Sequence, residues 1–534
     1  MSYALDFGTS NTVIARWNPA AEKSEILRLP DLSAQLGQNP ALIPSLLYVE
    51  NAAQPHVVAG QAVRDRGLDI HHDPRFFRAF KRGIGTPIQG FLPILEDQSI
   101  TFEQVGQWYL HQIMTQLQQQ YPDAKQSLVV TVPVDSFEAY RHWLGAVFSH
   151  LEVEQVRMID EPTAAALGYG KAHQDCLLVL DFGGGTLDFS LVQLDPQSRQ
   201  ASPALGFILK WGDQSFAQSS GQRQRTARVL AKAGQNLGGS DLDNWIVDHF
   251  VQTQNLPACA LTARLAERLK IQLSLQTQAT EVYFDDQAFE SYDLSLDRAE
   301  FEQILQQHQF FDRLDGCLQQ VIQGAQRQGL KIEDIDAVLM VGGSSQIPAV
   351  RHWVEQYFSA DKVLSHRPFD AIAHGALQLI QGTEVRDFLY HSYGVRYWDR
   401  RHNTHAWHPI IPAGQPYPMQ EAIELILGAS TEGQPSIELV IGELGSEHLG
   451  GTEVFFDGDR LVTRSLSTAQ AQIHPLNDTE GGRQIAPLRP PGYPGSDRIK
   501  VLFRVDAQRI LRMTVEDLLT QETLLDNQVV AALS

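Results

Sequence analysis

Residues 178–191 read LVLDFGGGTLDFSL. An apolar run leads into an acid, three glycines and a hydroxyl residue, and the alternation of apolar and polar residues then resumes, which predicts a strand, a tight turn and a second strand. The glycines leave no Cβ in the turn, so successive N–H groups can surround an anion. Asp181 and Asp188 flank the turn, and an anion beside two carboxylates requires a cation, which favours a phosphate carried with Mg²⁺. Taken alone, such a segment is more often only a turn.

The same pattern occurs near the N-terminus. Residues 3–17 read YALDFGTSNTVIARW, again an apolar strand, Asp-Phe-Gly with small and hydroxyl residues, and a second apolar strand. This repetition indicates an internal duplication. A Walker loop or a dinucleotide fingerprint requires a helix after its glycines, whereas both loops here return into strands. The sequence therefore predicts two facing hairpins, one in each lobe, that bind a polyphosphate between them.

Three further segments accompany the two loops, namely residues 161–170 (EPTAAALGYG), 237–243 (LGGSDLD) and 341–348 (VGGSSQIP). In this order, the segments resemble the heat-shock protein 70 (DnaK-type) chaperones of the actin, sugar-kinase and chaperone ATPase superfamily. The resemblance implies a multidomain fold: a two-lobed, actin-like α/β ATPase domain with a duplicated ribonuclease H-like fold, followed by a β-sandwich. It also implies ATP or ADP with Mg²⁺ as ligands.

The resemblance suggests the following domain bounds. A nucleotide-binding ATPase domain is expected over residues 1–383, an apolar interdomain linker over 384–391, and a β-sandwich peptide-binding domain over 392–534. The helical lid of the family is not expected in this sequence. Residues 206–228 expand a connection that is short in the family, and no function is assigned to them.

The catalytic residues implied by the resemblance are Lys81, Glu161, Thr186 and Asp181. A lysine among aromatic residues is usually a surface side chain with a buried stem, but Lys81 matches the family lysine that orients the attacking water. Glu161 either begins a helix or holds metal-bound water. Asp6 and Asp181 are expected to hold Mg²⁺ through water, while Lys81 and Thr186 act on the γ-phosphate.

The nucleotide-binding residues implied by the resemblance lie in both loops and in three later segments. They are Gly8, Thr9, Ser10, Asn11, Gly183, Gly184, Gly185, Gly238, Gly239, Glu267, Lys270, Ser274, Gly342, Gly343, Ser344, Gln346 and Asp370. Asp370 could instead cap the helix that follows it. Ile271 and Gln346 stand where the family places two arginines around the adenine, so the cation–π contribution is absent.

Two features bear on communication between the domains. Pro133 and Arg141 match a proline and an arginine that relay the nucleotide state in the family, although Pro133 could equally just end a strand. The residues between them, 134–138, depart from the family pattern. In the C-terminal part, Ile437, Leu439 and Ile441 alternate with other residues and indicate one apolar face, either a peptide groove or the sandwich core. Residues 471–497 are rich in proline and glycine and predict a long turn-rich connection.

Composition limits the partners. The chain has 534 residues, too many for one core, and a formal charge of −21, which argues against nucleic acid or an anionic membrane as a partner. Cys176, Cys259 and Cys317 lack metal-ligand spacing and indicate reduced residues of a cytoplasmic protein. No export signal and no apolar run of about eighteen residues is present, so membrane insertion is not expected.

The leading hypothesis is an ATP-dependent chaperone that hydrolyses ATP and holds exposed hydrophobic segments of unfolded proteins. Unfolded or extended hydrophobic peptides are its expected partners, together with a J-domain co-chaperone and a nucleotide exchange factor. The alternative is an exchange factor or scaffold of the same family that binds nucleotide and hydrolyses it weakly. A small-molecule kinase of the superfamily is a third candidate, but no sugar pocket can be identified.

Overall fold

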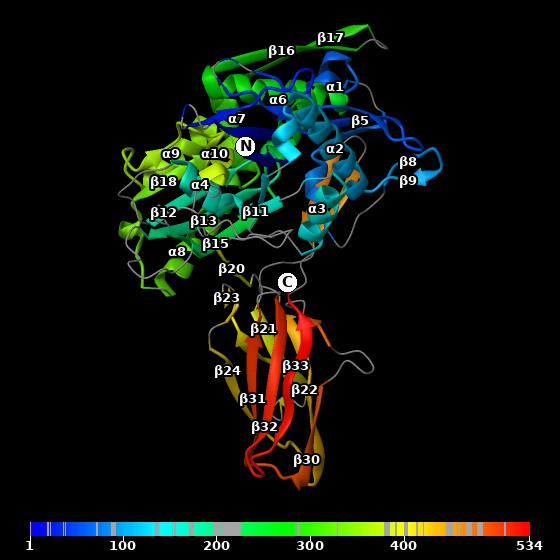
Figure 1. The fold of residues 1–534 in the computed structure, drawn as a ribbon. Helices are drawn as coiled ribbons and strands as arrows, with labels where there is room; N and C mark the ends of the chain where they lie inside the picture. The colour runs from blue at the N-terminus through cyan, green and yellow to red at the C-terminus, as the bar shows by residue number, and fades with distance from the viewer. Residues whose placement is uncertain are drawn as a thin grey trace. The chain divides into compact units, whose positions relative to one another are not determined.

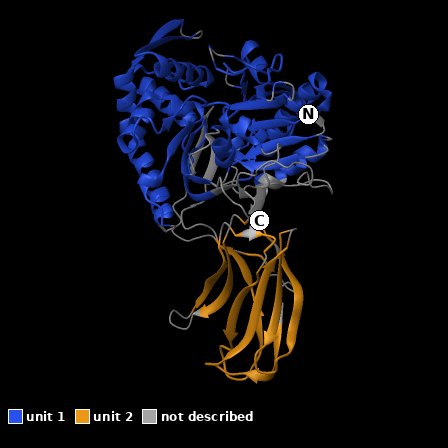
Figure 2. Cartoon of the chain, turned by 60° about the vertical axis from the view of Figure 1, so that its left-hand side comes forward, with its two compact units in different colours: residues 1–385, 453–464 blue, residues 386–452, 465–534 orange. Residues whose placement is uncertain are grey.

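The computed structural model describes the chain except for residues 1, 19–20, 22, 36, 38, 71–72, 87–91, 126, 134–137, 152, 154–155, 170–175, 196–203, 206–225, 286–288, 328, 379–384, 390–391, 400–403, 413–414, 420, 445–451, 458–459, 466–472, 478–483, 507–508 and 534. The chain divides into two compact units (Figure 2), residues 1–385 with 453–464 and residues 386–452 with 465–534. Most of the expanded connection 206–228 and parts of the expected linker 384–391 lie outside the described residues.

Unit 1 contains two sheets of the same topology (Figure 1). In each sheet, two strands joined by a glycine loop are antiparallel, and the first of them also pairs in parallel with a later strand. The first sheet has the order β11-β10-β1-β2-β3 and the second β15-β13-β12-β18-β19. Both predicted strand–turn–strand segments and the internal duplication are therefore present. The bounds are β1 (Tyr3–Phe7), β2 (Asn11–Asn18), β3 (Lys23–Ile26), β10 (Leu128–Val132), β11 (Val156–Asp160), β12 (Cys176–Phe182), β13 (Leu187–Asp195), β15 (Thr226–Gln235), β18 (Ala337–Val341) and β19 (Val363–Leu364).

Two helices of small residues lie between these sheets, α4 (Glu161–Tyr169) and α10 (Ala371–Gln378). Their alanines share one core cluster with residues from β1, β2 and β10 and from β12, β13 and β18. A Cβ on Gly375 would lie 1.7 Å from the carbonyl oxygen of Ala164, and one on Gly168 would lie 1.9 Å from that of Ala371. Glycine at both positions lets the helix backbones touch, so the two helices fix the spacing of the lobes.

The other face of the second sheet is covered by five helices. Side chains of β12, β13, β15 and β18 share a second core cluster with α5 (Gly239–Gln254), α6 (Ala260–Leu275), α7 (Arg298–Gln307), α8 (Phe310–Arg327) and α9 (Pro348–Tyr357). The hairpin of β16 (Gln278–Asp285) and β17 (Glu290–Asp297) also contributes to this cluster. Because both faces of the sheet are buried, its central strands are almost continuously apolar. Helix α6 carries Glu267, Lys270 and Ser274.

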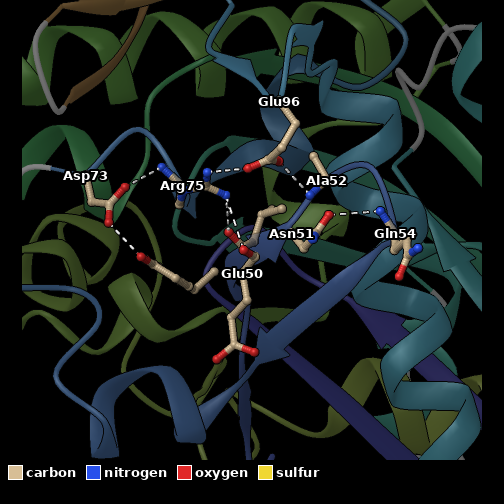
Figure 3. Close-up of polar contacts among 9 residues, drawn as sticks. Glu50, Asn51, Ala52, Gln54, Asp73, Arg75 and Glu96 are labelled. Carbon is tan, nitrogen blue, oxygen red and sulfur yellow. Dashed lines mark hydrogen bonds and ion pairs between the residues drawn. The ribbon is translucent and has the colours of Figure 1, made fainter.

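The first lobe carries α2 (Phe102–Gln120), α3 (Glu138–His150) and a small sheet of β5 (Leu46–Asn51), β6 (His56–Ala59) and β7 (Phe76–Arg78). The short helix α1 (Gln61–Asp65) follows β6, and β8 (Ile94–Leu95) and β9 (Gln98–Ser99) form a hairpin. Arg75 connects this hairpin to the small sheet (Figure 3), since its guanidinium contacts Glu96 and donates to the carbonyl oxygen of Val49 at 3.2 Å. Glu96 also accepts from the backbone N–H of Ala52 at 2.8 Å.

Unit 2 is a β-sandwich. One sheet contains β21 (Ser392–Asp399), β22 (Thr404–Ile411), β26 (Ile441–Leu444) and β29 (Ile473–Pro475), and the other β24 (Ile423–Gly428), β31 (Asp497–Val505), β32 (Ile510–Asp517) and β33 (Thr523–Ala532). Their inward side chains form a single core cluster. The remaining strands include β20 (Val385–Phe388), β23 (Pro416–Tyr417), and the paired β25 (Gln434–Leu439) and β30 (Gln484–Gly492).

In this unit the structure decides one alternative that the sequence left open and corrects one interpretation. Ile437, Leu439 and Ile441 are 7%, 0% and 0% exposed and belong to the sandwich core, so their apolar face does not line an open groove. The region 471–497 is not only a connection, because it contains β29 and β30. Its prolines suggested turns, but among the described strands β30 pairs only with β25, and a strand edge without a partner tolerates residues that cannot donate a hydrogen bond.

A buried ion pair crosses the second sheet of unit 2. The Nη2 of Arg498 donates to Oδ2 of Asp517 at 2.7 Å, and the two side chains are 6% and 1% exposed. We expect Asp517→Ala to lower the free energy of unfolding of unit 2 by roughly 3–5 kcal/mol, because it leaves the Arg498 guanidinium buried without its counter-charge. Calorimetry of the full chain, with limited proteolysis to identify the unit that unfolds, measures the change.

A neighbouring pair provides the control. Lys500 and Glu516 make a 2.7 Å ion pair on the same two strands, but their side chains are 27% and 37% exposed, so Lys500→Ala is expected to cost less than about 1 kcal/mol. Burial opposes ionisation of Asp517, but hydrogen bonds from Arg498 and from the N–H groups of Leu519 and Thr520 outweigh it and lower the pKa of Asp517. Stability from such a carboxylate is lost as the pH falls, so parent and Asp517→Ala should converge below about pH 4. Equal losses in both variants at neutral pH would contradict the assignment.

Candidate functional site

The two glycine loops have the same internal geometry. In the first, the N–H of Gly8 donates to the carbonyl oxygen of Asn11 at 3.1 Å, and in the second the N–H of Gly183 donates to that of Thr186, also at 3.1 Å. Each bond closes a short turn between two antiparallel strands. The loops are thus equivalent parts of the two lobes, as the repeated sequence predicts.

The loops approach each other closely. A Cβ on Gly184 would lie 1.8 Å from Oγ of Ser10, and one on Gly185 would lie 2.7 Å from Oγ1 of Thr9. These glycines are therefore required by the contact between the loops as well as by the turn itself. The structure brings together all of the loop residues expected from the sequence.

The start of α5 holds the second loop. The N–H groups of Gly239 and Ser240 donate to the carbonyl oxygens of Gly183 and Gly184 at 3.0 and 2.9 Å. A Cβ on Gly238 would fall 2.3 Å from the carbonyl carbon of Gly184, which explains the glycine pair of the LGGSDLD segment. The first turn of α5 therefore points its N–H groups at this loop, where a helix favours negative charge.

Lys81 and Glu161 form an ion pair beside the loops. Nζ of Lys81 donates to Oε1 of Glu161 at 3.0 Å, and the side chains are only 9% and 12% exposed. The ammonium group also lies 5.6 Å from the ring centroid of Phe7, at the end of β1. Lys81 is therefore a largely buried residue and not an ordinary surface lysine.

Three carboxylates gather around this ammonium group. Asp6 accepts a hydrogen bond from Oγ1 of Thr131 at 2.7 Å, yet burial and the charge of Glu161 raise the pKa of Asp6 to about 6. Burial, Glu161 and Asp188 likewise raise the pKa of Asp181 well above its ordinary value. Negative charge exceeds positive charge at this position, so the residues fit a divalent cation.

A cation here would have to be held largely by other ligands. Within the described ranges, no three His, Cys, Asp or Glu side chains are close enough together to coordinate a metal ion directly. Mg²⁺ commonly keeps several waters and binds through substrate phosphates. This donor set therefore suits a cation bound through water, with Asp6 and Asp181 in the outer positions.

The residues expected near the adenosine are already engaged with other protein groups. Oε2 of Glu267 pairs with Nη2 of Arg64 at 2.6 Å. Lys270 pairs with Asp243 at 2.7 Å and donates to the carbonyl oxygen of Gly239 at 2.8 Å. The hydroxyl of Ser274, in turn, donates to the carbonyl oxygen of Lys270, one turn earlier in α6, at 3.1 Å.

The segment after β18 completes the site. Ser344 donates from Oγ to the carbonyl oxygen of Gly183 at 2.9 Å, and Gly342 has a φ of 81° with no room for a Cβ. Gln346 donates to the hydroxyl of Ser345 at 3.2 Å. Gly343 lies against the ring of Phe369, where an added Cβ would come within 3.1 Å.

Asp370 lies just before α10. Its Oδ2 contacts Nη2 of Arg367 at 3.3 Å and Nε2 of His374 at 2.9 Å, and Nδ1 of His374 contacts the hydroxyl of Ser24 in β3. The carboxylate therefore takes part in a polar chain between α10 and the first lobe. Neither of the two roles expected for Asp370, near the ribose or as a helix cap, accounts for this chain.

A pocket opens next to the first loop. It encloses roughly 530 Å³ of non-protein space, partly open to solvent, and residues of both lobes line it, among them Thr9, Ser10, Ser240, Arg64 and Glu267. A smaller cavity includes Pro133 with Glu161 and Asp181 in its lining. Pro133 thus lies near the carboxylates, whereas the side chain of Arg141 is outside the described residues.

Sequence reasoning missed several residues that support the site. Ser45 donates from Oγ to the carbonyl oxygen of Gly8 at 2.7 Å, and its N–H donates to that of Ser10 at 2.8 Å. Arg82 pairs with Asp241 at 3.2 Å across the two lobes. Arg82 directly follows Lys81 and could have been recognised from that position in the sequence. No residue close to Ser45 in the sequence indicates the role of Ser45.

Two lobes of one topology, with facing glycine loops between them, define a two-lobed, actin-like fold. A family model described as "Hsp70 protein" matches residues 93–198 and 224–392, just over half of the chain. The chain belongs to the Hsp70 family. The expected fold class, a two-lobed ATPase-type α/β domain followed by a β-sandwich, is thereby confirmed.

Several curated proteins are similar to the chain. The "Chaperone protein DnaK" of Thermosipho africanus is 23% identical over 538 residues, which cover 96% of this chain and 77% of that protein. The "Chaperone protein DnaK 3" of a Synechococcus strain is 29% identical over 73% of the chain, and the "Chaperone protein dnaK1" of a Synechocystis strain is 26% identical over 79%. The matches span about half of the latter two proteins, 54% and 55%. These relationships support a chaperone function at the level of the family.

One further finding concerns membranes. None of the helices in the described part of the chain is long and apolar enough to span a bilayer.

The contact between the loops can be tested by filling it. We expect Gly184→Ala to destabilise unit 1 by roughly 1–3 kcal/mol, because the new methyl group would overlap Ser10 and force the lobes apart. Thermal unfolding of the full chain measures the change. Gly316→Ala on α8 is the control: apart from its own helix backbone and chain neighbours, no described residue has an atom within 4 Å of its added Cβ, so it should be neutral or stabilise by up to about 1 kcal/mol. If the contact is real, adding Ser10→Gly to Gly184→Ala should recover part of the loss; unchanged stability in Gly184→Ala would refute it.

Proposed function

We propose that the chain is an ATP-dependent molecular chaperone that binds and hydrolyses Mg²⁺-ATP between the two lobes of unit 1. The observation that supports this most strongly is the Lys81–Glu161 ion pair, largely buried beside Asp6 and Asp181 where the two glycine loops meet. Phosphoryl transfer to water requires mainly that groups be positioned and charge be neutralised, and this cluster offers both.

Each group of residues is proposed to have a separate role in binding or hydrolysing ATP. The loops at 8–11 and 183–186 would hold the phosphates with backbone N–H groups, while the N–H groups at the start of α5 hold the second loop in place. Lys81 would orient the attacking water and offset charge at the γ-phosphate, with Thr186 beside it and Glu161 holding the ammonium group in place. Mg²⁺, bound through water near Asp6 and Asp181, would neutralise part of the phosphate charge.

The residues expected near the adenosine favour a second candidate function, that of a weakly hydrolysing exchange factor or scaffold. Ile271 and Gln346 cannot stack as arginines would, and Glu267 and Lys270 already have ionic partners in the protein. A nucleotide bound there would depend more on its phosphates than on its base. We therefore expect ATP and other purine triphosphates to differ little in affinity if this end contributes weakly.

The β-sandwich of unit 2 is proposed to hold extended hydrophobic segments of unfolded proteins. Strand addition at a sheet edge, with pockets for alternate side chains, is a common mode of peptide recognition. The face carrying Ile437 and Leu439 is excluded as the groove because both side chains are in the core. J-domain co-chaperones and nucleotide exchange factors are proposed as further partners on the basis of the family alone.

Nucleotide binding is tested with Asp181→Asn. This change removes one of the crowded carboxylates, and we expect it to weaken ATP binding in the presence of Mg²⁺ by roughly tenfold, about 1.4 kcal/mol. The loss should become much smaller when Mg²⁺ is removed by a chelator. Isothermal titration calorimetry of parent and variant measures both affinities. Equal ATP affinity with Mg²⁺ present would refute the placement of the cation.

Hydrolysis is tested with Lys81→Ala. A group that acts mainly in the transition state lowers turnover far more than it lowers ATP affinity, so single-turnover hydrolysis should fall by roughly 10²-fold or more with little change in binding. Release of inorganic phosphate is the measurement, with and without an unfolded peptide. Stimulation by peptide supports the chaperone, binding without release supports the scaffold, and unchanged hydrolysis in Lys81→Ala would remove the lysine from the mechanism.

A further inference from the structure

Ser45 binds two carbonyl oxygens of the first glycine loop. Its Oγ donates to the carbonyl oxygen of Gly8 at 2.7 Å, and its backbone N–H donates to that of Ser10 at 2.8 Å. Ser45 directly follows β4 (Ile43–Pro44), which pairs with the start of β2, and it is only 2% exposed. One buried residue therefore fixes two peptide groups of the loop.

These two bonds determine where the N–H groups of the loop point. In a trans peptide group the C=O and the N–H point in opposite directions. The carbonyl group of Gly8 shares its peptide group with the N–H of Thr9, and that of Ser10 shares its peptide group with the N–H of Asn11. Because both carbonyl oxygens face Ser45, the N–H groups of Thr9 and Asn11 face away from it. Successive N–H groups directed to one side can bind an anion, whereas a carbonyl oxygen turned to that side would repel it.

Two further hydroxyl groups hold the side chain of Ser45. A carbonyl oxygen can only accept, so the Ser45 hydroxyl gives its single hydrogen to Gly8. The hydroxyl of Thr12 lies 3.3 Å from Oγ of Ser45 and is therefore the donor of that pair. Thr12 accepts in turn from the hydroxyl of Tyr109 at 3.1 Å, and both residues are 0% exposed. The three hydroxyls form a chain of hydrogen bonds that ends on the carbonyl oxygen of Gly8.

The second glycine loop has an equivalent bond, made by a residue from a different part of the fold. Oγ of Ser344 donates to the carbonyl oxygen of Gly183 at 2.9 Å. Ser344 follows β18, which is a parallel neighbour of β12, whereas Ser45 follows β4, an antiparallel neighbour of β2. The two serines are thus not equivalent in the duplicated topology, and the duplication does not explain why both loops have this bond. A requirement shared by the loops does explain it.

We propose that Ser45 is a positioning residue for phosphate binding. It holds the carbonyl oxygens of Gly8 and Ser10 to one side, so that the N–H groups of Thr9 and Asn11 can bind the phosphates of the nucleotide on the other. This inference rests on the proposed binding of Mg²⁺-ATP between the lobes. It assigns the orientation of the first loop to a residue that makes no contact with the phosphates itself.

Ser45→Ala tests the proposal because it removes the hydroxyl and keeps the backbone N–H. The Gly8 peptide group would then lose its fixed orientation, and affinity for Mg²⁺-ATP should fall by roughly tenfold, about the effect of one hydrogen bond to a charged group. Isothermal titration calorimetry of the full chain measures the affinity. Hydrogen exchange of peptides covering residues 3–17 and 178–191, at saturating ATP, locates the effect. ATP should protect the first loop less in the variant than in the parent, with protection of the second loop unchanged.

Thr12→Val is the matched control. It removes a buried hydroxyl from the same chain of hydrogen bonds but leaves the bond from Ser45 to Gly8 in place. Like Ser45→Ala, it should lower the thermal midpoint, yet affinity for Mg²⁺-ATP should change by no more than about twofold. An equal loss of affinity in the two variants would overturn the assignment to Ser45, because the packing of the whole hydroxyl chain would then support the loop.

The outcomes separate this inference from the proposed function. Unchanged affinity for Mg²⁺-ATP in Ser45→Ala would overturn the inference alone. Equal loss of protection in both loops would also overturn it, since the effect would then not be specific to the first loop. A parent that binds Mg²⁺-ATP without releasing phosphate would overturn the proposed hydrolysis alone, because the role of Ser45 is measured by affinity. A parent that binds no ATP would overturn both.

Discussion

The arrangement of unit 1 depends on the contact between α4 and α10. These helices touch through Gly168 and Gly375, and any larger residue would have to push the backbones apart. α10 packs on strands of the first sheet and α4 on strands of the second, so the separation of the two helices sets the distance between the lobes. Glu161 begins α4, and the position of its carboxylate is therefore a direct consequence of this packing. The absence of a side chain at Gly168 and Gly375 thus determines the geometry of a site formed by both lobes.

Charge crowding is the second constraint. Asp6 and Asp181 both lie close enough to Glu161 for its charge to raise their pKa, and Lys81 supplies the positive charge that faces them. The Lys81 ammonium group is largely buried, which strengthens these interactions. Three carboxylates and one ammonium group leave an excess of negative charge, so a polyanion could approach this cluster only together with a cation. This is the physical basis on which a phosphate reaction is proposed in unit 1.

The sequence predicted the features that are encoded locally. Both loops, their flanking strands and the start of α4 were recognisable from patterns that extend over only a few residues. These patterns are glycines in a turn, alternating apolar and polar residues in a strand, and proline in the first turn of a helix. Contacts between distant segments were not predictable: Arg64 and Glu267 are far apart in the chain, and only the fold makes them a pair. The apolar alternation at Ile437 fitted either a groove or a core, and the structure decided for the core. The prolines of β30 suggested a turn because proline, which has no N–H to donate, is tolerated both in turns and at a strand edge without a partner.

The attachment of Lys270 has a mechanical consequence. This side chain extends from α6 to the carbonyl oxygen of Gly239, whose N–H in turn holds Gly183 in the second loop. The hairpin β16–β17 follows α6 directly, so α6 connects this hairpin, through Lys270, to the glycine loop. Only two hydrogen bonds, from Lys270 to Gly239 and from Gly239 to Gly183, separate the helix from the loop.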